Sequence, residues 1–156
     1  MGQLARTNNE LGFHEFVNKS ALDTKLKQLF VEGHIVKVKV ERKSKSWHIF
    51  LKCKDIIPYA GLRDLAEEVV DKIPSLQHVF LIPCFTPGQF TLLDFCNEYA
   101  DLLKSYIIYF VPSAKGWLEQ IKWEVEYSTI YLFLPNQVLV GFLEQKRYPQ
   151  FVEMIL

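Results

Sequence analysis

The sequence predicts an α+β fold in which small antiparallel or mixed sheets carry helices packed on one face. Two stretches alternate apolar and polar residues with the period of a strand, and two others repeat apolar residues at helical intervals, with proline and glycine between them. The chain has 156 residues, of which 49% are apolar. This composition is that of a globular protein with one domain or two small ones.

The first predicted helix follows a polar start. Residues 1–12 lack apolar periodicity, so we expect a flexible arm there and ordered structure from about Phe13. Ser20 and Asp23 have the spacing of a capping box with Asp in place of Glu, and apolar residues follow at helical intervals: Leu22, Leu26, Leu29 and Phe30. Gly33 stands where a left-handed C-cap is expected.

A hairpin is predicted after this helix. Residues 36–41 alternate valine with charged residues, which indicates a strand with one dry and one wet face. A polar turn over 42–46 follows, and residues 47–53 alternate again. The two strands are therefore expected to pair.

A helix and a further strand complete the first predicted unit, 13–84. Pro58 opens the helix, its apolar stripe ends at Pro74, and residues 79–82 form a short apolar run typical of a buried strand. The predicted order is α-β-β-α-β. It is similar to a K-homology fold of the type that begins with the hairpin, but no two of the seven glycines stand three apart, so the Gly-x-x-Gly loop that clamps RNA is absent.

The second predicted unit, 91–156, follows a linker at 85–90 that contains Pro87 and Gly88. Its predicted order is α-α-β-β-α-α. A first helix is expected over 92–103, whereas periodicity leaves the type of 106–111 open. The remaining elements are a short helix from Ser113, a hairpin of 121–126 with 130–134, a helix after Pro135 and Asn136, and a last helix over 150–156.

The charge is unevenly distributed along the chain. Eighteen Lys and Arg balance eighteen Asp and Glu overall, but residues 1–54 carry eleven basic and five acidic residues, a net charge of +6. Residues 37–54 alone hold seven basic residues and one acidic residue. This asymmetry favours a basic face that meets phosphate or an acidic partner.

Several classes of function lack their sequence signals. The longest apolar run, 106–111, is far too short to span a membrane, and the polar start lacks a signal segment, so we expect a cytoplasmic protein. No phosphate-binding glycine loop, zinc-ligand spacing or nucleophile elbow occurs. We expect no catalytic residue, metal, cofactor or small-molecule substrate, and reduced, buried cysteines.

The one informative stretch is the predicted hairpin, which places cations beside an aromatic residue. A single-stranded nucleic acid uses this pairing, because cations neutralise its phosphates and an aromatic face stacks its bases. The candidate nucleic-acid-binding residues are Lys37, Lys39, Arg42, Lys43, Lys45, His48 and Phe50. The alternative is a strand edge that lysines protect from aggregation, with Trp47 in the core.

This stretch also carries a resemblance to a known family. The run Leu29-Phe30-Val31-Glu32-Gly33-His34-Ile35, followed by Lys43-Ser44-Lys45-Ser46-Trp47-His48-Ile49, resembles the N-terminal domain of the PolC-type DNA polymerase III alpha subunit of Gram-positive bacteria. The match is good over 21–82, weakens through 85–112 and returns as an order of elements over 118–151. The family motif residues are Gly33, Lys43, Ser44, Ser46, Trp47 and His48.

The resemblance implies a non-catalytic piece of a larger enzyme. The parent is a DNA-directed DNA polymerase with 3'-5' exonuclease activity, and none of its catalytic residues can be carried over to this chain. The family pattern would go on to another strand after Leu156, so we expect the chain to be part of a longer polymerase or a truncated reading frame. A nucleoid-associated location in the cytoplasm follows.

The resemblance also implies a docking role in DNA replication. The N-terminal region of the family is similar to the polymerase-binding domain of the clamp-loader tau subunit, which makes a replisome protein, and tau first, the expected partner. The second unit is also rich in aromatic residues, which are the kinds of residue that anchor interfaces: Tyr106, Tyr109, Phe110, Trp117, Trp123, Tyr127 and Tyr131. The alternative function is direct binding of single-stranded or primer-template DNA through the basic hairpin 37–54.

Overall fold

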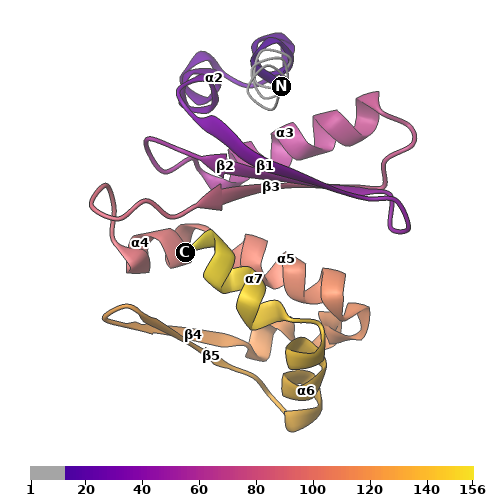
Figure 1. Ribbon diagram of the computed structural model, residues 1–156, viewed down its shortest axis with the longest axis vertical. Coiled ribbons are helices and arrows are strands. Elements are labelled where there is room, and N and C mark those ends of the chain that lie inside the picture. Colours follow the sequence, from indigo (N-terminus) through magenta and orange to yellow (C-terminus); the bar gives the residue numbers. More distant parts are fainter. Residues whose placement is uncertain (1–12) are drawn as a thin grey trace. The chain divides into compact units, whose positions relative to one another are not determined.

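The computed structural model describes residues 13–156, and the chain divides into two compact units, Met1–Gln89 and Phe90–Leu156 (Figure 1). The flexible arm expected at 1–12 lies outside the described residues. Both units combine helices with a small sheet, which confirms the α+β class.

The first unit has the predicted element order after one additional helical segment at 13–19. Its sheet has the strand order β1-β2-β3, with β1 and β2 antiparallel and β2 and β3 parallel. The central strand, β2, is therefore flanked on both sides (Figure 1). The elements are α2 (Thr24–Val31), β1 (His34–Glu41), β2 (Ser46–Lys52), α3 (Tyr59–Lys72) and β3 (His78–Cys84).

The start of α2 differs from the prediction. Asp23 is the N-cap, and its carboxylate accepts a hydrogen bond of 2.8 Å from the backbone N–H of Leu26. The Ser20 hydroxyl instead donates to the carbonyl oxygen of Val17 at 2.6 Å, within the preceding segment. The predicted capping role of Ser20 was wrong because α2 begins only at Thr24, with Asp23 as its N-cap; the Ser20 hydroxyl accepts instead from the N–H of Leu22, before the helix, at 3.4 Å.

Gly33 is also in a different conformation from the one predicted. The C-cap of α2 is Glu32 in the right-handed helical region, and Gly88 is the glycine with positive φ in the described part of the chain. A Cβ atom at Gly33 would lie 3.3 Å from the carbonyl oxygens of both Phe30 and Lys52. The glycine is needed for this close approach rather than for a left-handed turn.

The two faces of β1 are not divided into dry and wet as expected. The central strand is well covered, with Ile49 and Leu51 exposing 6% and 2% of their surfaces. On β1, in contrast, Val38 exposes 41% and Val40 exposes 56%. The alternation correctly predicted that these valines share one face of the strand. That face is not dry, because β1 is an edge strand and has fewer neighbours to cover it than the central strand has.

Helix α3 forms as predicted. It begins after Pro58, which is its N-cap, and its backbone pattern ends at Ile73, just before Pro74. Its buried side chains include Leu62, Leu65 and Val69. The helix packs closely on α2 at Gly61, where a Cβ atom would lie only 3.1 Å from the Leu26 side chain.

The second unit differs from the prediction mainly at its first helix, which is two helices joined at Tyr99. The stretch 106–111, whose type was left open, is helical through Phe110. The predicted hairpin and both C-terminal helices are present. The elements are α4 (Leu92–Glu98), α5 (Ala100–Phe110), the 3-10 helix η1 (Pro112–Gln120), β4 (Lys122–Glu126), β5 (Thr129–Phe133), α6 (Gln137–Gln145) and α7 (Tyr148–Ile155).

Aromatic residues form much of the core of the second unit. Tyr106 and Phe151 stack with ring centroids 4.0 Å apart, and the buried Tyr148 hydroxyl donates to the carbonyl oxygen of Leu103 at 3.0 Å. Tyr127, at the tip of the β4–β5 turn, exposes 94% of its surface. Across the described residues of both units, no helix is long and apolar enough to cross a membrane.

Candidate functional site

The turn between β1 and β2 presents the predicted cations and is held by the rest of the sheet. Lys45 closes it in a left-handed conformation with φ 50°, and its N–H donates to the carbonyl oxygen of Arg42 at 3.3 Å. The Lys45 carbonyl oxygen accepts from the N–H groups of Gln77 and His78, at 2.8 and 3.3 Å. The start of β3 therefore anchors the turn.

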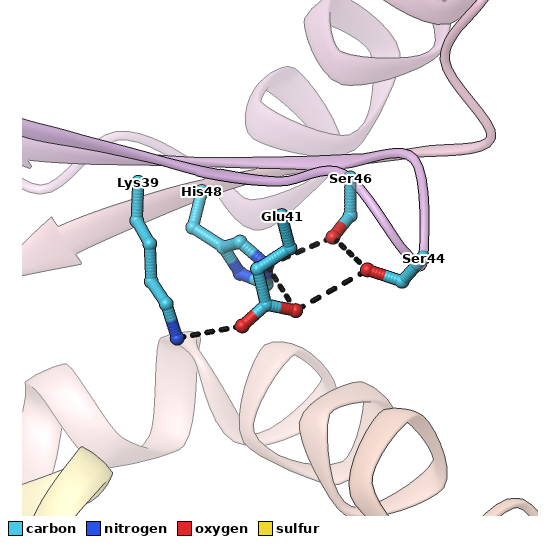
Figure 2. A network of polar contacts seen from close by, with 5 residues as sticks. All are labelled: Lys39, Glu41, Ser44, Ser46 and His48. Carbon is cyan, nitrogen blue, oxygen red and sulfur yellow. Dashed lines mark hydrogen bonds and ion pairs between the residues drawn. The ribbon is translucent and has the colours of Figure 1, made fainter.

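A network of polar side chains lies below this turn (Figure 2). The Ser44 hydroxyl lies 3.2 Å from Glu41 Oε2 and 2.6 Å from Ser46 Oγ. Ser46 Oγ in turn lies 3.1 Å from His48 Nε2. Glu41 Oε1 pairs with Lys39 Nζ at 2.6 Å, and Glu41 Oε2 lies 3.8 Å from His48 Nε2. The network connects both strands to the turn.

Burial controls the protonation of His48. The residue exposes 3% of its surface, and burial lowers its pKa, although the nearby Glu41 carboxylate raises the pKa in part and Lys39 lowers it further. The neutral ring stacks on Phe80 with centroids 5.3 Å apart. A neutral imidazole has one nitrogen that donates and one that accepts, so it can complete the hydroxyl chain without a buried charge.

The residues that carry the family resemblance are mostly enclosed in the hairpin. Ser46 and His48 are buried, Ser44 is half-buried, and all three belong to the network. Trp47 is half-buried on the opposite face of β2. Among the motif residues of this hairpin, Lys43 alone is exposed. The serines and the histidine therefore support the turn from inside, whereas Lys43 lies on its surface.

The predicted nucleic-acid-binding residues fall into two groups. The exposed group is Lys37, Lys39, Arg42, Lys43 and Lys45. His48 and Phe50 are buried, with Phe50 exposing 4% of its surface and Lys37 Nζ lying 5.8 Å from its ring centroid. The expected exposed aromatic was therefore wrong at Phe50, because alternation assigns a residue to a face without showing whether that face is covered. Arg42, Lys43 and Lys45 are called the basic turn below.

An apolar groove, which the sequence did not reveal, lies on the other face of the hairpin. It has a volume of about 300 Å³ and lies between β1 and β2, the C-terminal part of α3 and the helical segment 13–19. Trp47 and Ile49 pair with Val40 and Val38 across the two strands to form its floor. We call it the valine groove. Its lining residues are Phe13, Phe16, Ile35, Val38, Val40, Trp47, Ile49, Val69 and Ile73.

Neither metal ligands nor reactive thiols come together in the described residues. Within 13–156, no group of three or more His, Cys, Asp or Glu side chains could hold a metal ion. The cysteines are free thiols; Cys53 and Cys96 are buried and Cys84 is half-buried. Burial raises the pKa of Cys53 to about 12 and that of Cys96 to about 11, which keeps both protonated at neutral pH.

Comparison with known protein families finds a match in the first unit. Residues 12–80 match the family described as DNA polymerase III polC-type N-terminus I, a range that covers the described residues from the helical segment 13–19 through α3 and into β3. No curated protein and no solved structure matches the chain significantly. The match includes the hairpin, its polar network and the valine groove. Residues 12–80 are therefore similar to the N-terminal region of the PolC-type DNA polymerase III.

Proposed function

We propose that the first unit is a non-catalytic docking module that attaches a PolC-type polymerase to a replisome protein during DNA replication. The clamp-loader tau subunit is the first candidate partner. The observation that carries the proposal is the valine groove, which is open along the edge strand β1, with the basic turn at the end of the same hairpin.

The groove has the composition of an interface centre. Val38 and Val40 expose 41% and 56% of their surfaces to solvent, and their cross-strand partners Ile49 and Trp47 extend the same apolar surface. Protein interfaces combine such an apolar centre, in which Trp is a frequent anchor, with a polar rim. The basic turn would supply that rim, so the fitting partner segment carries apolar side chains followed by acidic ones.

The test is binding of the whole chain to purified tau by calorimetry. Val40→Asp places a charge in the groove, and we expect it to weaken binding at least tenfold, or about 1.4 kcal/mol. Val138→Asp is the matched control, because Val138 exposes 60% of its surface on α6 of the other unit. Unfolding curves establish that both variants fold. A folded wild-type chain that does not bind tau would refute this partner, and equal losses in both variants would refute the groove.

A second candidate function is binding of single-stranded DNA through the exposed cations. It is favoured by the basic turn: no carboxylate of the described residues forms an ion pair with Arg42, Lys43 or Lys45. Because Phe50 is buried, the contacts would be to phosphates, with little preference among bases.

Salt dependence tests this second function. If Lys37, Lys39 and the basic turn all met phosphates, log affinity against log salt would slope by about −3.5 on single strands. The combined variant Lys39→Glu, Lys43→Glu and Lys45→Glu should then lose binding of a fluorescent oligonucleotide at both low and high salt. A flat salt response of the wild-type chain would exclude this function.

A further inference from the structure

A polar cleft lies at the other end of the first hairpin from the basic turn. It has a volume of about 240 Å³, and its lining includes Glu32, His34, Lys52, Lys54, Thr86 and Gln89. All of these residues belong to the first unit. Neither the family motif nor the proposed docking function uses them.

The sheet topology explains why these residues meet. In the register of the sheet, His34 of β1 pairs with Lys52 of β2, and Lys52 pairs with Cys84 of β3. Because β2 and β3 are parallel, the segments that follow Lys52 and Cys84 leave from the same edge. A crevice beyond the carboxyl ends of parallel strands is a common ligand site in α/β sheets.

The lining is rich in hydrogen-bond donors and positive charge. Lys52 and Lys54 are exposed ammonium groups, and Gln89 adds an amide. The Thr86 hydroxyl oxygen is buried and has no hydrogen-bond partner, a state that requires an explanation in a folded protein. Rotation of the Thr86 side chain toward the cleft would let this hydroxyl donate to a bound ligand that accepts a hydrogen bond.

One acidic residue also lines the cleft. A Glu32 carboxylate oxygen accepts a hydrogen bond of 3.2 Å from Gln28 Nε2 on α2. The two lysines outweigh this single negative charge, so the cleft favours an anion. Two ammonium groups would repel a metal ion, which excludes a cation site.

We propose that this cleft binds a phosphate group, carried by a nucleotide or by a DNA strand. A phosphate offers several strong acceptor oxygens and more negative charge than a carboxylate, and it can therefore engage both lysines and the Thr86 hydroxyl at once. Lysine is a common phosphate ligand because its ammonium acts as a mobile point charge. This site does not depend on the docking function or on the basic turn.

The test is a titration of the isotope-labelled whole chain, followed by the NMR shifts of its backbone amides. Three probes are used separately: inorganic phosphate, thymidine monophosphate and an oligothymidine without terminal phosphates. We expect saturable shifts confined to the cleft, with His34, Thr86 and Gln89 as reporters. Saturation by the first two probes alone assigns a free phosphate or nucleotide, and saturation by the oligothymidine assigns the DNA backbone.

Three variants should change the affinity, two downward and one upward, and a fourth should leave it unchanged. The double variant Lys52→Gln and Lys54→Gln should weaken binding at least tenfold, and Thr86→Val should weaken it severalfold. Glu32→Gln should strengthen it severalfold, because a negative charge is removed while the hydrogen bond to Gln28 can be kept. Lys25→Gln, on an exposed position of α2, is the matched control and should leave it unchanged.

The proposal fails on either of two results. One is the absence of saturable shifts at the cleft with all three probes. The other is an affinity that Lys25→Gln lowers at least half as much, on a logarithmic scale, as the double lysine variant does; because the double variant removes twice the charge, binding would then follow net charge rather than the cleft.

Discussion

Ser46 Oγ lies 3.1 Å from His48 Nε2, and both side chains are buried on the same face of β2. Ser46 also contacts Ser44 Oγ at 2.6 Å, so a chain of hydroxyl groups runs from the exposed turn to a buried imidazole (Figure 2). This relationship explains why a motif that looks suited to ligand binding is mostly inaccessible: its serines and histidine determine the shape of the turn.

Removal of the central hydroxyl should destabilise the first unit. Ser46→Ala leaves Ser44 and His48 without their shared partner in a buried position, and we expect a loss of about 1–2 kcal/mol in the free energy of unfolding. Urea unfolding measures it. Ser75→Ala, at an exposed position before β3, is the control and should change stability by less than about 0.5 kcal/mol. Equal effects of the two substitutions would contradict a structural role of the network.

The lowered pKa of His48 predicts a loss of stability in mild acid. The unfolded histidine takes up a proton near its ordinary pKa of about 6.5, whereas the folded one remains neutral to lower pH. The contribution of His48 to the free energy of unfolding is therefore fully present above the pKa of the unfolded histidine, and it is lost as the pH falls toward the lower pKa of the folded one. Glu41, Lys39 and His78 act on the same ring.

Unfolding midpoints measure this pH dependence. We expect the wild-type chain to be less stable at about pH 5.5 than at about pH 7.5, and His48→Gln to reduce that difference. The comparison is of the pH-dependent change within each protein, because the substitution also alters packing. An unchanged difference in the variant would assign the effect to other groups.

The left-handed conformation of Lys45 predicts an unusual order of substitutions. The φ of Lys45 is 50°, a region that glycine adopts without steric conflict. Lys45→Gly should therefore leave the free energy of unfolding nearly unchanged, whereas Lys45→Val should lower it by about 1–2 kcal/mol. Lys43→Val, in the same turn without a positive φ, should cost less. Thermal unfolding ranks the variants, and equal costs for both valine substitutions would refute the strain.

Two substitutions at Gly33 can show whether glycine is required there by crowding or by a left-handed conformation. A Cβ atom there would lie 3.3 Å from two carbonyl oxygens, so Gly33→Ala should lose about 1 kcal/mol and Gly33→Asn more, because asparagine is larger. At a left-handed cap the order would be reversed, since asparagine tolerates that region better than alanine. The relative unfolding free energies of the two variants decide between the explanations.

The cysteines should be inert in the folded chain. With its pKa raised to about 12, Cys53 is thiolate to about one part in ten thousand at pH 8, and burial also raises the pKa of Cys84. A thiol reagent should therefore react slowly with the native chain and rapidly with all three cysteines in urea. Fast reaction of the native chain at Cys53 would contradict the described packing.

Much of the fold could be predicted because its signals are local. The alternation in 36–41 and 47–53 is a property of neighbouring residues, and it located both strands and their turn. Pro58 and Asn136 likewise marked the starts of α3 and α6, since each acts on the backbone within one turn of helix. The same local patterns carried the resemblance that the family match over 12–80 confirms.

Tertiary structure alone decided which surfaces are available. Alternation shows that Phe50 and His48 share one face and that Val38 and Val40 share the other, but the strand order and the elements packed on each face determine exposure. For this reason Phe50 is buried, whereas the valines of the edge strand remain open. The polar cleft depends in the same way on the parallel pairing of β2 with β3, which brings Lys52 and Thr86, distant in sequence, to one edge of the sheet.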